Sequence, residues 1–202
     1  MDELLNCEFY ITWKDVEDLK RKYEDFYNIV YQAKTQDKIK LDQEFNKFID
    51  DYNRLDYKVE SRNKKYVEEE LQLHKDLFDD VENFNLTEKE LENPDRIKKS
   101  LDANQRRAVV TNELSNQIVA GAGCGKTLTV LGKVRYLTER KGVKPDEILC
   151  LSYSNKSVND LKEKLPKGIN TYTFHGLGRS ILLANNRPAR PDENALKDFI
   201  RI

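Results

Sequence analysis

Apolar side chains recur at helical spacing through the first ninety residues. One stripe covers residues 16–31, and a second, with alternating steps of four and three residues, covers 41–59. A third stripe covers residues 66–81, and the polar run 61–63 is the expected turn before it. The pattern predicts three helices, the latter two forming an antiparallel hairpin.

The second half alternates between short apolar runs and amphipathic stretches. Such alternation predicts an α/β fold, with a parallel sheet that carries helices on both faces. The expected helices are 101–110, 126–140, 155–165 and 175–183, and the expected strands are 117–120, 147–153 and 169–174.

A glycine-rich loop follows the first expected strand and precedes a helix. It consists of Ala120, Gly121, Ala122, Gly123, Cys124, Gly125, Lys126 and Thr127. Strand, glycine turn and helix are the context of a phosphate-binding loop, although Ala120 stands where the strict pattern has glycine. Glycines let backbone N–H groups point inward, and the helix adds its positive dipole end. We expect a nucleoside triphosphate here, with Lys126 at its phosphates and Thr127 as a Mg²⁺ ligand.

Charge and turn residues divide the chain. Residues 1–100 carry 26 acidic and 18 basic side chains, whereas residues 101–202 carry 10 acidic and 17 basic ones. All eight glycines lie at or beyond Gly121, and no proline precedes Pro94. We therefore expect an acidic helical region (1–93), a connector (94–100) and a basic α/β region (101–202), the last being the better nucleic-acid candidate.

Three cysteines without a CxxC pair favour a reducing compartment over a disulfide framework or a zinc ribbon. The acidic N-terminus does not resemble a signal peptide, and no run approaches the roughly 20 apolar residues of a membrane span. We expect a cytoplasmic protein with no membrane partner. His74 lies on an apolar stripe without a second ligand at metal spacing, which predicts a packed histidine.

Three blocks of the second half occur in a recognisable order. Gln105 precedes the glycine-rich loop, the block 151–157 closes the second expected strand, and the block 171–176 closes the third. Together they resemble superfamily 1 DNA helicases of the UvrD/Rep type. The segment 62–71 is similar to one in the DNA helicase IV branch, which the chain resembles most.

The resemblance implies a partial RecA-like domain that binds ATP and Mg²⁺, with Gln105 contacting adenine. It implies contacts with single-stranded DNA from Tyr153, Ser154, Asn155, Lys156, Thr173, Phe174 and His175. An aromatic face stacks on unpaired bases, while amides, hydroxyls and amines bind phosphates. For Tyr153 and His175, an ordinary structural role at a strand end or helix start stays open. In the intact protein the family implies 3′-to-5′ translocation, in repair, recombination or defence.

Other family motifs are absent. No Asp-Glu-x-Gln motif follows an apolar strand, and the run 192–194 is interpreted as a loop or helix cap. Arginines of a second lobe are also missing, although phosphoryl transfer depends on such charges. The chain stops at Ile202 within an expected helix, so we expect the ATP-binding front part of a longer protein or a split system, with little unwinding alone.

Two alternatives stay open. The chain is a non-catalytic module whose acidic helical region docks a protein partner, or it is a P-loop ATPase or kinase unrelated to helicases.

Overall fold

The computed structural model describes residues 1–36, 40–81 and 88–186. The predicted roles of residues 192–194 and of the final helix lie outside this part. The chain divides into two compact units, one of residues 1–81 with 97–136, the other of residues 82–96 with 137–202. Among the helices that the structure describes, none combines the length and the apolar character that a membrane span requires.

The N-terminal part of the first unit is helical, as predicted. After the short α1 (Asp2–Leu5), α2 (Trp13–Thr35) begins at a capping box in which Thr12 and Asp15 bond to each other's backbone N–H. The remaining helices of this part are α3 (Gln43–Asn53), α4 (Leu55–Leu73) and α5 (Lys75–Asp79).

The predicted turn at residues 61–63 is wrong, because α4 passes through it without a break. Asn63 is buried there, and its amide bonds to both backbone groups of Ile11. The chain breaks instead at Arg54 and His74. The position of a turn former within the tertiary structure therefore outweighed its local preference.

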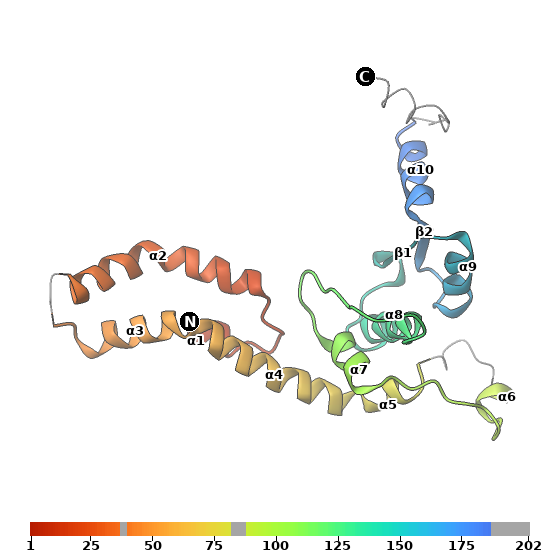
Figure 1. Ribbon diagram of the computed structural model, residues 1–202, viewed down its shortest axis with the longest axis horizontal. Helices are drawn as coiled ribbons and strands as arrows, with labels where there is room; N and C mark the ends of the chain where they lie inside the picture. Colours follow the sequence, from red (N-terminus) through yellow and green to blue (C-terminus); the bar gives the residue numbers. More distant parts are fainter. Residues whose placement is uncertain (37–39, 82–87, 187–202) are drawn as a thin grey trace. The chain divides into compact units, whose positions relative to one another are not determined.

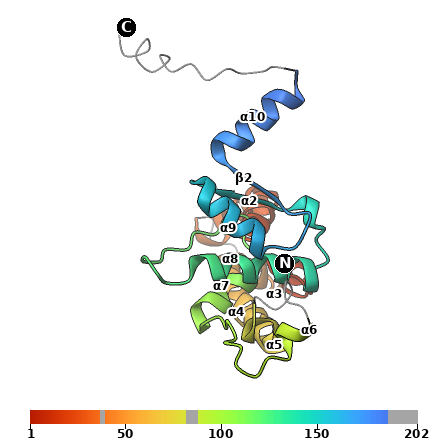
Figure 2. The same cartoon turned by 90° about the vertical axis from the view of Figure 1, so that its right-hand side faces the viewer.

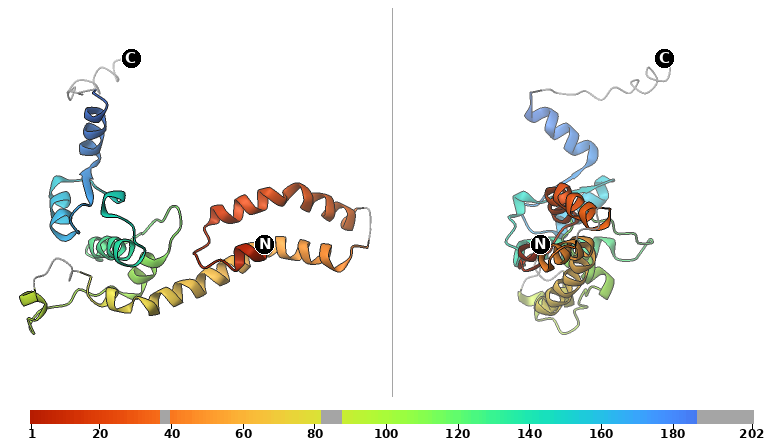
Figure 3. Two further views of the ribbon diagram at one scale, coloured as in Figure 1. Left: turned by 180° about the vertical axis from the view of Figure 1, so that it is seen from behind. Right: turned by 90° about the vertical axis from the view of Figure 1, so that its left-hand side faces the viewer.

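The predicted hairpin partner is also corrected. Helix α2 lies antiparallel to α3 and the start of α4, which follow one another in nearly the same direction (Figures 1 and 3). Aromatic rings fill this contact, including the stacked pair Tyr27–Tyr52 at 4.2 Å. The heptad-like stripe does face a partner helix, but that partner is α2, because α3 and α4 are too nearly collinear to pack on each other.

A second core in the first unit joins α4 and α5 to α7 (Ala103–Val110) and α8 (Lys126–Arg135). Its buried side chains are Val67, Leu77, Phe78, Val81, Leu101, Val109, Val110 and Tyr136. The compact unit therefore crosses the predicted boundary at 94–100.

The predicted packed role of His74 is confirmed, since it is buried, 3.3 Å from Glu70 and edge-on to Tyr136.

The second unit contains the parallel pair β1 (Leu149–Ser152) and β2 (Asn170–Thr173). Helices α9 (Asn155–Lys164) and α10 (Phe174–Ala184) follow these strands, as predicted. The unit also holds α6 (Glu88–Leu91), most of a π-helical turn at Tyr136–Arg140 and a 3-10 turn at Pro145–Glu147. A parallel α/β arrangement is confirmed in this small form, with two strands in the part of the chain described here.

Candidate nucleotide and nucleic-acid sites

Helix α7 begins at a second capping box. The Asp102 carboxylate accepts from the backbone N–H groups of Asn104 and Gln105, at 2.8 and 2.9 Å. In return, Oε1 of Gln105 accepts from the Asp102 N–H at 2.9 Å. These bonds satisfy N–H groups that a helix start leaves without intrahelical partners, and they hold the Gln105 side chain in one orientation.

The other end of the Gln105 amide contacts the glycine-rich loop (residues 120–127). Its Nε2 donates to the carbonyl oxygen of Cys124 at 3.1 Å and lies 3.5 Å from that of Gly125. An amide nitrogen has two hydrogens, which these two carbonyls take up, whereas the amide oxygen has two lone pairs and accepts only one bond, from Asp102. Gln105 thus aligns the loop and can still present an acceptor to a ligand.

Two glycines give the loop its backbone path. Gly123 and Gly125 have φ of 78° and 70°, in the left-handed region that side chains disfavour. A Cβ at Gly125 would also lie 2.6 Å from Nε2 of Gln105, whereas one at Gly123 would meet nothing within 4 Å. Gly125 therefore suits the loop both by its conformation and by leaving room for the Gln105 amide.

Lys126 and Thr127 form the first turn of α8, and both side chains are exposed. The Lys126 ammonium donates to the carbonyl oxygens of Ala120 and Gly121, at 2.8 and 2.5 Å. The cation thus folds back over the loop. Together with the helix dipole, it makes the loop a favourable place for an anion. Ala122 and Cys124 are exposed on the same loop.

The predicted strand at 117–120 is wrong. This segment forms no strand, and Ile118 and Val119 are 51% and 89% exposed. Apolar strand residues become buried only where neighbouring strands and helices cover them, and the two strands that the structure describes pair with each other. The loop is therefore preceded by an extended, exposed segment.

Two residues that the sequence did not single out fix α8 against α7. The Lys133 ammonium donates to the carbonyl oxygens of Val109 and Thr111 at 2.7 and 2.9 Å, at the end of α7. Gly132 allows close packing, since a Cβ there would lie 2.7 Å from Cδ1 of Leu101. A glycine inside a predicted helix was the available signal for this packing.

In the second unit, the ends of the two strands bring the other candidate residues together. Ser152 is paired with Thr173, so Tyr153 and Phe174 follow adjacent strands at one sheet edge. Ser154 caps α9 through the N–H of Ser157 at 3.2 Å, and Thr173 caps α10 through the N–H of Gly176 at 3.0 Å. Two helix N-termini therefore begin beside these aromatic residues (Figure 2).

The aromatic side chains at this edge are largely free of the core. Tyr153 is 93% exposed and Phe174 is 63% exposed. Asn155, Lys156 and His175 are exposed in the first turns of α9 and α10. Aromatic faces beside a cation and helix N-termini match the chemistry of bases and phosphates.

Comparison with known families agrees with these motifs. Residues 101–199 match the UvrD/REP helicase N-terminal domain. This part of the chain belongs to the UvrD/Rep helicase family. The match begins directly before α7 and contains every candidate residue described above, and its last residues lie outside the described part.

Individual helicases are also similar to part of the chain. A probable DNA helicase II homolog of Mycoplasma pneumoniae is 32% identical over 117 residues, or 52% of this chain and 16% of that protein. ATP-dependent DNA helicase Rep of Buchnera aphidicola is 34% identical, covering 41% of this chain and 14% of the relative. DNA helicase IV of Escherichia coli is 33% identical, covering 41% and 13%. The similarity therefore spans a small part of each relative, and the particular affinity to the helicase IV branch stays a prediction.

Proposed function

We propose that the UvrD/Rep part of this chain binds ATP at the glycine-rich loop, within a RecA-like domain. The observation that carries the proposal is the loop itself. Left-handed Gly123 and Gly125 lead directly into α8, and the Lys126 ammonium lies over the carbonyls of Ala120 and Gly121. Nucleotide phosphates would take the place of those carbonyls as partners of Lys126, while the N–H groups at the start of α8 face the same anion.

Mg²⁺ would accompany the nucleotide. A hydroxyl beside a phosphate site suits this hard cation, and Thr127 offers one in the first turn of α8. The metal would supply charge neutralisation for phosphoryl transfer. Gln105 would orient the base, since its amide is held in place and its oxygen keeps capacity for a donor, while its nitrogen would exchange the more distant Gly125 carbonyl for an acceptor of the base.

We further propose that the sheet edge of the second unit binds single-stranded DNA. Tyr153 and Phe174 would stack on unpaired bases, and Lys156, Ser154, Asn155, Thr173 and His175 would contact the backbone. In the intact protein we propose ATP-driven translocation from 3′ to 5′, a direction that derives from the family resemblance. A cytoplasmic location and a protein partner for residues 1–93 stay predictions from charge and cysteine pattern.

The test is equilibrium binding of ATP to the purified chain, with Lys126→Ala as the matched variant. We expect Mg²⁺-dependent binding that falls at least about tenfold in the variant, because an ionic contact with phosphate contributes on the order of 1.5–3 kcal/mol. Equal binding by both proteins would contradict a nucleotide site at this loop and favour the alternative of a non-catalytic docking module. Turnover measured in the same samples, with and without single-stranded DNA, then shows whether this chain hydrolyses ATP by itself.

A further inference from the structure

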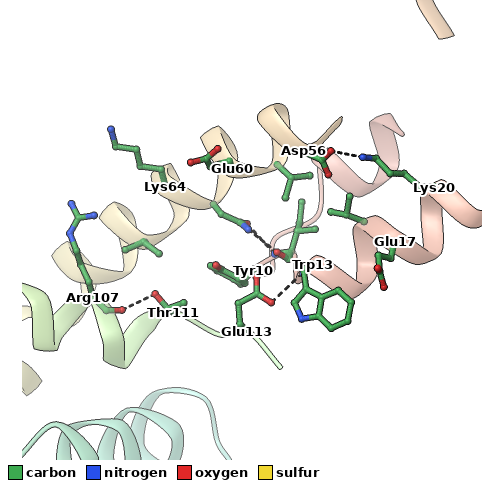
Figure 4. A pocket seen from close by; sticks show the side chains of 15 residues that line it. Tyr10, Trp13, Glu17, Lys20, Asp56, Glu60, Lys64, Arg107, Thr111 and Glu113 are labelled. Atoms are coloured by element: carbon green, nitrogen blue, oxygen red, sulfur yellow. Dashed lines mark hydrogen bonds and ion pairs between the residues drawn. The ribbon is translucent and has the colours of Figure 1, made fainter. Parts of the chain in front are cut away.

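Glu113 links the segment before the glycine-rich loop to the N-terminal helices. Its carboxylate accepts a hydrogen bond from the backbone N–H of Trp13 at 3.2 Å (Figure 4). Trp13 is the first residue of α2, a helix of 23 residues. A carboxylate at that position also interacts favourably with the positive end of the helix dipole.

The same carboxylate also interacts electrostatically with Tyr10. Both side chains line the same hollow, and burial, followed by the negative charge of Glu113, raises the pKa of the Tyr10 phenol. Glu113 therefore accepts from the first residue of α2 and interacts with Tyr10 of the stretch that leads into this helix. A charged acceptor makes a stronger hydrogen bond than a neutral one.

That stretch is firmly attached to α4. Asn63 of α4 accepts from the Ile11 N–H at 3.1 Å and donates to the Ile11 carbonyl at 2.7 Å, and both residues are buried. The Tyr10 ring packs edge-on against Tyr66 at 5.9 Å. Glu113 thus bonds to a well-supported part of the molecule.

The segment between Glu113 and the glycine-rich loop has little supporting structure. Residues 114–119 are exposed and form neither helix nor strand. They lead to Ala120, whose carbonyl accepts from Lys126. Glu113 is therefore the last residue before the glycine-rich loop that bonds to a distant segment in the described part of the chain.

We propose that Glu113 is a positioning residue for the glycine-rich loop, coupling nucleotide binding there to the start of α2. This inference rests on the proposed nucleotide binding. Order imposed on the loop by a nucleotide strengthens the contact of Glu113 with Tyr10 and Trp13, and loss of that contact weakens nucleotide binding by the same factor.

The chain provides its own reporter. Trp13 is its single tryptophan, 52% exposed at the rim of a hollow of about 940 Å³ that Tyr10 and Glu113 also line (Figure 4). Fluorescence excited at the long-wavelength edge of the tryptophan absorption band, where tyrosine hardly absorbs, therefore reports on this residue. Glu60 lines the same hollow from α4 and serves as a matched control for removal of a carboxylate.

The experiment compares wild type, Glu113→Ala, Glu113→Gln and Glu60→Ala. ATP affinity is measured by equilibrium dialysis, Trp13 emission is followed during ATP titration, and hydrogen exchange over residues 114–125 is measured without nucleotide. We expect Glu113→Ala to raise the dissociation constant about fivefold, to abolish the ATP-dependent emission change and to speed exchange. Glu113→Gln, which keeps an acceptor oxygen, should be intermediate, and Glu60→Ala should match wild type.

The outcomes separate this inference from the proposed function. ATP binding and hydrogen exchange that are unchanged in Glu113→Ala would overturn the positioning role while leaving nucleotide binding intact. If wild type does not bind ATP, the proposed function fails. Faster exchange in Glu113→Ala would then still support the positioning of the loop, and unchanged exchange would overturn it.

Discussion

The side-chain amide of Gln105 donates to the backbone carbonyl of Cys124 across 3.1 Å, joining the first turn of α7 to the glycine-rich loop. The same side chain closes the capping box of α7 through its oxygen. The oxygen of this residue therefore stabilises a helix start, and its nitrogen aligns the loop. A substitution that changes only one of the two atoms tests the two effects separately.

Replacing Gln105 with Glu keeps an acceptor for the Asp102 N–H but removes the donor to Cys124. We expect α7 to persist and nucleotide affinity to fall about tenfold, because a carboxylate would face a carbonyl oxygen and a nearby anion. Preference for ATP over GTP should be lost as well, since the donor and acceptor pair is gone. Competition binding with both nucleotides checks this, and an unchanged preference would argue against an adenine contact.

The two left-handed glycines should differ in their tolerance of alanine. Both substitutions place a Cβ at positive φ, which costs about 1–2 kcal/mol. Gly125→Ala adds a clash with Nε2 of Gln105 that Gly123→Ala lacks. We therefore expect Gly125→Ala to weaken ATP binding more than Gly123→Ala, and equal losses would show that the contact with Gln105 does not matter.

Cys124 should react with an alkylating reagent before Cys150. It is exposed on the loop, whereas Cys150 is buried and burial raises the pKa of its thiol. Peptide mapping after brief treatment at pH 8 should show modification at Cys124 before Cys150. We expect ATP binding to be lost in step with this modification and to be protected in Cys124→Ser. Unchanged binding after complete modification would exclude the loop as the nucleotide site.

The exposed aromatic residues at the sheet edge should contribute to DNA binding. Stacking contributes about 1–3 kcal/mol per base, so Tyr153→Ala and Phe174→Ala should each weaken binding of a single-stranded oligonucleotide roughly tenfold. Tyr57, an exposed aromatic residue of α4, provides the control. Fluorescence anisotropy measures the affinities, and equal values for all three variants would contradict this interface.

Stability should depend on the buried phenol of Tyr136. It donates to the Glu70 carboxylate, and burial together with this bond raises its pKa above the ordinary value of 10. The folded state keeps the phenol proton to a higher pH than the unfolded state does. The contribution of this phenol to the free energy of unfolding is therefore complete below about pH 10 and is lost as the pH rises further. We expect Tyr136→Phe to cost about 2 kcal/mol at pH 7 and to flatten the alkaline loss of stability. Urea unfolding at pH 7 to 11 measures both effects.

Local sequence patterns were sufficient for much of the second half. The helix expected over 101–110 corresponds to α7, and the glycine turn before Lys126 predicted the entry into α8, because capping and left-handed backbone depend on nearby residues. The parallel pairing of β1 and β2 also followed from alternating strands and helices. These features lie within the segment that matches the UvrD/Rep domain.

Contacts between distant residues decided the rest. A helical stripe shows which side of a helix is apolar but not what covers it, so α3 packs on α2 rather than on α4. Asn63 is a residue type that favours turns. It nevertheless lies within a helix, because it bonds to Ile11, which is 52 residues away along the chain. The run 117–120 is apolar enough for a strand, but within the described residues the two strands pair with each other and not with it. Periodicity and composition therefore determined the elements and their chemistry, and only the tertiary structure decided their partners, since hydrogen bonds and burial require both members of a pair.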